Sequence, residues 1–471
     1  MTFVRACSLL AVVAASSALA VLIRNHARAA TAPTTVTSAA DERLLGSVDV
    51  SGAAAAPSQR LAIVPLLTQD DAESVTQQIV RRDLERSGEF DLASVDVVAE
   101  GPFSRTKSID TKAWSAKGID VLVRVTSEPL SATARTFTAE AWLSKSGLTA
   151  PSQTRSTTFD VDHVRLGAHS LSDALLGLTT GRAGTFESRM VFARTVDGGR
   201  QVHVVDADGF GLRGLGPASQ IALSPTFGPA DETYYSLAID SGPFRLVHGN
   251  AATPVVWPAL SGVGGVLGVA FSSDRKRVVL TTMRAGVSTL WAGDADGTHL
   301  APTKVGPFAT HPVLGPLGKI AWVAGAPPRV FVDGKAISPN GIAASAPTFC
   351  DSPKGLFVVF GVEVLGGSDL VATDVDGHGL LRLTQGQGNN RDAACSPDGR
   401  LVAFFSTRTS GAGPGLYVMP LATPRRAQSG PPHLRVENSR KDLKPIVRIP
   451  PSDFASLRDA SGPSGRGSLE E

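Results

Sequence analysis

The sequence predicts two domains, an α/β domain followed by an all-β six-bladed β-propeller. Three observations predict this order. Helical periodicity is confined to the part before about residue 184, a strand-and-turn unit recurs after it, and the 471 residues include 48 glycines and 31 prolines. Chains with many short strands and tight turns need these two residue types. The pattern disfavours a bundle of helices and leaves ample chain for a sizeable core.

The first residues have the pattern of an export signal. Arg5 supplies positive charge, residues 7–23 are apolar or small, and Ala27-Arg28-Ala29 is an A-x-A cleavage site. We therefore predict a signal peptide at residues 1–29. The alternative is an uncleaved membrane anchor, because the apolar run approaches the roughly 18 to 20 residues that span a bilayer. Residues 30–47 are rich in Ala, Ser and Thr, and we expect a flexible N-terminal arm there.

Residues 48–182 alternate between strand and helix patterns, which predicts an α/β domain. Asp70, followed by Glu73, has the spacing of a capping box before a helix that Gly88 ends. Asp162 is expected to cap the last helix, whose apolar stripe faces the core. The expected helices cover 70–88, 110–118 and 162–181, and the expected strands cover 48–50, 61–66, 119–125 and 137–143.

Residues 183–425 repeat a turn followed by an apolar strand. The copies lie about 36 to 45 residues apart, the length of a four-stranded blade. Six copies predict six blades in a closed ring, since a single blade cannot bury both of its faces. The repeated strands are 188–193, 232–236, 277–280, 319–323, 355–359 and 400–404. Proline pairs and a Gly/Ser run punctuate residues 426–471, so we expect a disordered C-terminal tail that folding does not need.

Charge and cysteine content narrow the class of protein. Lys and Arg number 45 against 43 Asp and Glu, a net charge of +2, so the basic surplus that nucleic-acid binding needs is missing. Cys350 and Cys395 are the two cysteines beyond the signal, and they occupy equivalent places in successive repeats. Because we expect such places to lie farther apart than the roughly 7 Å between Cα atoms that a disulfide tolerates, we predict that both thiols are reduced.

The residue pattern gives little support for catalysis or for metal binding. The Asp-x-Asp-Gly turns at 206–209, 294–297 and 374–377 resemble the start of a calcium loop, but Phe210 stands where a third ligand is needed. We interpret them as hairpin turns. The sequence contains no G-x-S-x-G nucleophile elbow and no glycine-rich loop that opens a helix after a strand. We therefore predict no catalytic residue, no metal and no cofactor.

Four stretches have an order and spacing that are informative together. They are Asp83–Phe90, Trp114 with Gly118–Val123, Arg165–Arg189 and Leu383–Gly399. Together they resemble the TolB family of the Tol-Pal cell-envelope system over about residues 48–425. The resemblance places His169, Asp173 and Arg189 at a structural junction between the two domains. His169 and Asp173 are also one helical turn apart, which predicts a contact pair on one helix face.

The resemblance implies a periplasmic, non-catalytic and monomeric protein that reaches membranes only through its partners. Its propeller would bind the peptidoglycan-associated lipoprotein Pal, and its N-terminal arm would engage the inner-membrane protein TolA. Such a scaffold supports outer-membrane integrity, division and protein import. The alternative is an exported propeller enzyme or small-ligand-binding protein, since a fold does not fix a function.

Loops that enter the innermost strand of each blade should surround one mouth of the ring. Residues 389–392 form the most polar of these loops, directly before the Ser-Pro-Asp-Gly turn that starts at Ser396. We expect them to be exposed and to carry partner binding. The alternative is an ordinary solvated loop. The candidate partner-binding residues are His311, Asn340, Asn389, Asn390, Arg391 and Asp392.

Overall fold

A computed structural model describes the greater part of both predicted domains. The described residues are 59–67, 69–94, 103–147, 150–196, 198–239, 242–306, 308–386, 388–409, 414–421, 437–438 and 447–449. The predicted signal peptide, the arm and the strand expected at 48–50 lie outside them. Over these described ranges, every helix is too short or too polar to cross a bilayer.

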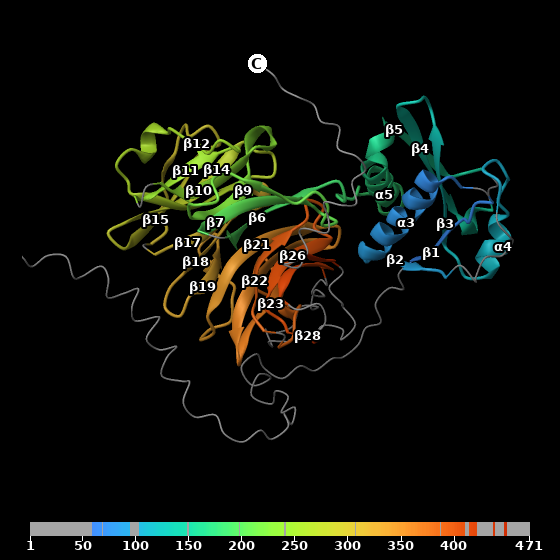
Figure 1. The fold of residues 1–471 in the computed structure, drawn as a ribbon. Helices are drawn as coiled ribbons and strands as arrows, with labels where there is room; N and C mark the ends of the chain where they lie inside the picture. The colour runs from blue at the N-terminus through green and yellow to red at the C-terminus, as the bar shows by residue number, and fades with distance from the viewer. Residues whose placement is uncertain are drawn as a thin grey trace, which may run out of the picture. The chain divides into compact units, whose positions relative to one another are not determined.

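The N-terminal region is a five-stranded sheet in the order β2-β1-β3-β4-β5, parallel from β2 to β3 and antiparallel from β3 to β5. Its strands are β1 (Gln59–Ile63), β2 (Phe90–Leu92), β3 (Val121–Pro129), β4 (Ala134–Leu143) and β5 (Gln153–Asp160). Its helices are α3 (Asp71–Arg86), α4 (Thr111–Ala116) and α5 (Val164–Thr180). Helices α3 and α5 lie side by side on the sheet (Figure 1) and share one apolar core with it. A second core forms around Trp114 of α4.

One of the two predicted helix N-caps is present in the structure, and the other is not. Asp70 accepts a hydrogen bond from the Glu73 backbone N–H at 2.8 Å, as an N-cap does. The Glu73 side chain does not complete a capping box. It is buried and binds Arg105, with 2.6 Å between Oε2 and Nη2. Asp162 does not cap α5, whose N-cap is His163 without a side-chain bond, because a short 3-10 turn at Val161–His163 leads into that helix.

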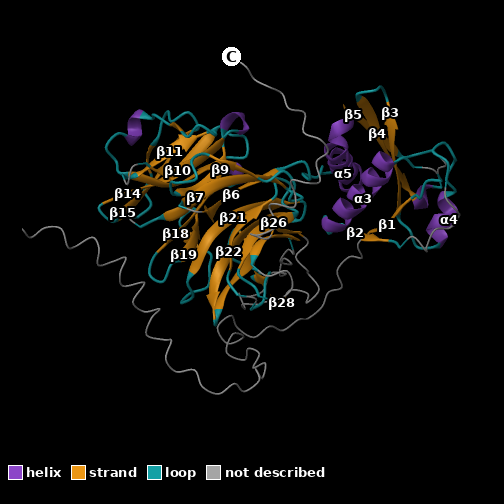
Figure 2. Ribbon diagram, in the orientation of Figure 1, coloured by secondary structure: helices purple, strands orange, loops and turns teal. Residues whose placement is uncertain are grey.

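The described residues after 188 form six mainly antiparallel sheets, the blades of a propeller (Figure 2). Blade 1 is β6 (Arg189–Val196), β7 (Gly199–Asp206) and β8 (Arg213–Leu215). Blade 2 is β9 (Ala222–Phe227), β10 (Thr233–Ala238), β11 (Phe244–His248) and β12 (Thr253–Pro254). Blade 3 is β13 (Gly265–Phe271), β14 (Arg277–Arg284), β15 (Val287–Asp294) and β16 (Ala301–Pro302). The predicted fold class, an α/β domain plus a six-bladed propeller, is confirmed.

Two of the last three blades include a strand from the predicted tail. Blade 4 is β17 (Thr310–Leu314), β18 (Ile320–Ala324), β19 (Arg329–Val332) and β20 (Lys335–Ala336). Blade 5 is β21 (Ala344–Ser352), β22 (Gly355–Val364), β23 (Gly367–Asp374) and β24 (Leu381–Arg382), with β28 (Glu437–Asn438) beside β24. Blade 6 is β25 (Asn390–Cys395), β26 (Leu401–Ser406) and β27 (Gly415–Pro420), with β29 (Val447–Ile449) beside β27. Residues 426–471 thus include two short paired strands where we expected none, and the rest of that segment lies outside the described residues.

The prediction for the two cysteines is wrong. Cys350 in β21 and Cys395 in β25 form a disulfide, and their Cα atoms are 5.4 Å apart. The two residues do occupy equivalent places in adjacent blades, as the sequence indicated. They lie on the innermost strands, which pack against each other at the centre of the ring, so the separation between equivalent positions is smallest there and falls within the range for a disulfide.

Candidate functional site

All five innermost strands that the structure describes contain a β-bulge at the same place. The register of β9, β13, β17, β21 and β25 against the next strand shifts by one residue in each case. The residue at the bulge has a positive φ in four of them: Ser224 (47°), His311 (50°), Ala346 (44°) and Asp392 (54°). Non-glycine residues rarely adopt this conformation, and bulges redirect side chains. The repeated bulge therefore sets one residue per blade at an equivalent position of the ring.

Two of these bulges are joined by a hydrogen bond between neighbouring blades. The Ser224 hydroxyl of blade 2 donates to the backbone carbonyl of Leu267, the bulge residue of blade 3, at 3.0 Å. His311 and Asp392, from blades 4 and 6, are the titratable members, and both are exposed. Desolvation by the surrounding strands lowers the pKa of His311, and the negative charge of Asp392 opposes that shift. Two residues that the sequence singled out separately thus act on each other electrostatically.

Arg391 and Asp392 also line a cavity between blade 6 and blade 1. Its volume is about 350 Å³. Phe192, Ala193 and Arg200 line it from blade 1. Phe405 and Leu416 line it from blade 6. Apolar side chains and guanidinium groups thus line the same cavity, a combination suited to an apolar group next to an anion.

Asn390 does not belong to the exposed surface, contrary to our expectation. Its side chain is fully buried, and its amide Nδ2 donates to Asp369 Oδ1 of blade 5 at 3.1 Å. Its Oδ1 accepts from the Ser406 hydroxyl of blade 6 at 2.8 Å and from Arg408 Nη2 at 3.2 Å. Asn390 therefore joins two blades and fixes the backbone from which Arg391 and Asp392 extend.

His169 lies at the junction of the two regions, but its partner is not Asp173. Its Nδ1 is 2.6 Å from Asp83 Oδ2 on α3, and its Nε2 is 3.1 Å from Asp208 Oδ2 in the turn between β7 and β8. Burial lowers the pKa of His169, but the hydrogen bonds to Asp208 and Asp83 outweigh it and raise that pKa to about 9. Arg165 of α5 binds Asp206 and Asp208 of the same turn. The first Asp-x-Asp-Gly turn therefore contacts α5. Its carboxylates bind the side chains of Arg165 and His169.

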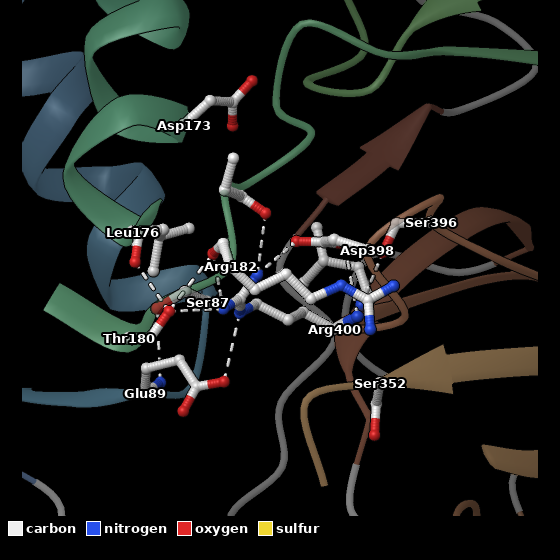
Figure 3. A network of polar contacts seen from close by, with 12 residues as sticks. Ser87, Glu89, Asp173, Leu176, Thr180, Arg182, Ser352, Ser396, Asp398 and Arg400 are labelled. Carbon is white, nitrogen blue, oxygen red and sulfur yellow. Dashed lines mark hydrogen bonds and ion pairs between the residues drawn. The ribbon is translucent and has the colours of Figure 1, made fainter. Parts of the chain in front are cut away.

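Arg400 makes the densest set of contacts at this junction, and the sequence analysis did not single it out. Its guanidinium binds Asp398 at 3.0 Å, Glu89 at 3.1 Å and the Thr180 hydroxyl at 2.7 Å (Figure 3). It also donates to the backbone carbonyls of Arg182 and Ala183. Its place directly after the best-kept Ser-Pro-Asp-Gly turn was the available signal, since Asp398 of that turn orients it.

Residues 46–144 match the family model of the TolB amino-terminal domain. This part of the chain is thus similar to that family. The Tol-Pal system protein TolB of Mannheimia succiniciproducens is 26% identical over 192 residues, which cover 40% of this chain and 44% of that protein. The corresponding protein of Actinobacillus succinogenes is 23% identical over 199 residues, with the same coverage. The chain thus spans less than half the length of these curated relatives.

A solved structure extends the likeness to the fold of both domains. The crystal structure of TolB from Acinetobacter baumannii superimposes with a TM-score of 0.60 over 77% of this chain and 91% of that one, at 18% identity. At this identity the likeness is one of fold.

The other predicted residues lie in the N-terminal region and in the propeller. Asp173 accepts backbone N–H bonds from Phe186 at 2.7 Å and from Glu187 at 3.2 Å, where the chain leaves α5 for blade 1. Burial raises the pKa of Asp173 to about 7, although these two bonds oppose the shift. Arg189 begins β6, with its guanidinium 5.3 Å from the centre of the Phe227 ring.

Asn340 and Asn389 are exposed, and neither lines the cavity. Asn389 uses its backbone N–H to bind the Thr407 hydroxyl at 2.8 Å. In the third Asp-x-Asp-Gly turn, the side chains of Asp374, Asp376 and His378 come within 4.8 Å of one another. Asp374 Oδ1 already accepts the backbone N–H groups of Asp376 and His378, at 2.9 and 2.8 Å, as in an ordinary Asx turn.

Proposed function

We propose that this chain is a non-catalytic periplasmic scaffold of the Tol-Pal system. The match of residues 46–144 to the TolB amino-terminal domain carries the proposal, and the propeller that follows supports it. In this role the propeller binds a Pal-like lipoprotein, and the N-terminal arm binds a TolA-like protein. The protein would then act peripherally at the membrane, in outer-membrane integrity, division and protein import.

The mouth of the ring at Arg391 and Asp392 is the proposed lipoprotein site. Both side chains are more than 45% exposed, at 61% and 47%, and the buried Asn390 holds their backbone in place. A backbone that is already fixed reduces the entropy lost on binding, and arginine is enriched among residues that dominate interface energy. Residues 389 and 311 would contribute at the rim.

Affinity capture from detergent-solubilised envelope tests this function. The chain without residues 1–29 serves as bait, and mass spectrometry should identify a peptidoglycan-associated lipoprotein among the captured proteins. Arg391→Ala should weaken lipoprotein binding at least tenfold, which corresponds to about 1.4 kcal/mol. Arg213→Ala, at an exposed arginine of β8 outside the cavity, is the matched control and should bind as the parent does. Capture of no envelope lipoprotein by the parent would refute the proposal.

Binding of a small ligand is a second candidate function, because the cavity of about 350 Å³ falls within the roughly 300 to 1,000 Å³ typical of small-molecule sites. Thermal stabilisation by a compound in a metabolite library, lost in Phe405→Ala, would favour it over the scaffold. The scaffold would bind an envelope protein, whereas the second candidate would bind a small molecule. The same preparation of the chain can be used for both tests.

A further inference from the structure

Blade 1 differs from the others in its inner edge. The apolar repeat strand, which follows the turn in each blade, is the second strand of blades 2 to 6, at β10, β14, β18, β22 and β26. In blade 1 the same repeat strand is β6, and within the described residues it pairs with β7 alone. The position that β9 or β25 fills in the other blades is thus without a described strand here.

An edge strand of this kind can pair with another chain. β6 is eight residues long, and in an antiparallel pair alternate residues direct their N–H and C=O groups away from the partner strand. Such groups are a template for an added strand. Two described neighbours define the space: β9 packs on one side of β6, and blade 6 contributes Phe405 and Leu416 to the cavity on the other.

The residues that line the cavity beside β6 indicate which side chains an added strand would need. Phe192 and Ala193 of β6 form its apolar wall together with Leu416. Three arginines, Arg194, Arg200 and Arg391, line the cavity together with a single carboxylate, Asp392. The Nε of Arg200 is buried and has no hydrogen-bond partner in the part of the chain that the structure describes. A buried donor on a cation is costly when unpaired, and a carboxylate is the acceptor that best satisfies it.

We propose that the inner edge of β6 binds an extended acidic segment of a partner protein by β-strand addition. Backbone hydrogen bonds to β6 would supply affinity, apolar side chains would pack on Phe192, and carboxylates would bind Arg200 and Arg391. The inference rests on the proposed function and specifies the partner segment, because Arg391 and Asp392 belong to both sites.

Fluorescence anisotropy with a synthetic peptide tests the inference. The probe is a fluorescein-labelled ten-residue peptide in which valine alternates with glutamate, titrated with the full chain without residues 1–29. Saturable binding is expected, and Arg200→Gln and Arg391→Gln should each weaken it about tenfold. Arg213→Gln should leave it unchanged. Unchanged melting temperatures for the exposed Arg391 variant would show that the loss is not unfolding.

Two altered peptides and one shortened chain identify the binding mode. Replacing glutamate by lysine, or methylating alternate backbone nitrogens, should abolish binding, and retention of affinity by either peptide would overturn strand addition to the arginine-lined edge. Binding that appears only after removal of residues 450–471 would assign the edge to the chain's own C-terminal segment and also overturn the proposal. Capture of a lipoprotein without peptide binding would refute this inference alone, whereas peptide binding without lipoprotein capture would refute only the proposed function.

Discussion

Asn390→Ala should destabilise the propeller, although it truncates a single side chain at the start of β25. The amide is fully buried and is the only side chain of residues 389–392 that bonds both Asp369 and Ser406. Truncation removes its bonds and leaves those two buried partners and Arg408 without it. An unsatisfied buried polar group costs about 1 to 3 kcal/mol, so we expect a loss of about 2 to 4 kcal/mol, since some partners retain other bonds.

Thermal unfolding monitored by circular dichroism measures the effect, with Asn389→Ala as the matched control. Asn389 is exposed, and its described bond to Thr407 uses the backbone N–H, which alanine preserves. Surface changes of this kind alter stability by less than about 0.5 kcal/mol. A melting temperature for Asn390→Ala within a degree of the Asn389→Ala value would refute the assignment of Asn390 as a bridge between blades 5 and 6.

Three further predictions follow from the junction and the inner ring. Reduction of the Cys350–Cys395 disulfide, which closes a loop with a sequence separation of 45, should lower stability by about 4 kcal/mol; equal melting curves with and without reductant would contradict it. The pKa of His169 in the folded protein is raised to about 9. The stability that this group adds is therefore fully present below its pKa in the unfolded chain, about 6.5, and is lost as pH rises through 9. His169→Asn should flatten this part of the pH–stability curve. Arg400→Met removes the bonds to Thr180 and Glu89, and we expect at least tenfold faster hydrogen exchange at the end of α5 in that variant than in Arg277→Met, an exposed arginine.

Many of the helices and strands were predictable because caps, turns and apolar runs in the local sequence mark where they begin and end. Asp70 and Gly88 act where the sequence placed them: Asp70 accepts the Glu73 N–H, and Gly88 follows the end of α3 with a φ of 69°. The six repeat strands were readable because each combines a turn with an apolar run. Strand β5 was missed because its residues are mostly exposed and show no apolar alternation, so that its pairing with β4 depends on the backbone.

Long-range contacts account for the parts of the site that the sequence did not predict. Asn390 and Arg391 are adjacent and similar in polarity, yet one is buried between two blades and the other is exposed. The alternation of a strand places successive side chains on opposite faces, but which face meets a neighbouring blade is known only once the ring has closed. His169 likewise has its partners 86 and 39 residues away, beyond the reach of any helical spacing rule.

The bulges show why such a site can be built without a sequence motif. Ser224, His311, Ala346 and Asp392 hold the same positive φ at the same place in four blades, and they share neither size nor charge. The strain of that conformation, of order 1 kcal/mol or more for a residue with a Cβ, is therefore imposed by the blade and not chosen by the residue. The backbone of the ring fixes where a side chain stands, and substitution at that position can change its chemistry without rebuilding the strand. On this basis exchanging His311 or Asp392 should alter what the ring mouth binds while the register of β17 and β25 is kept.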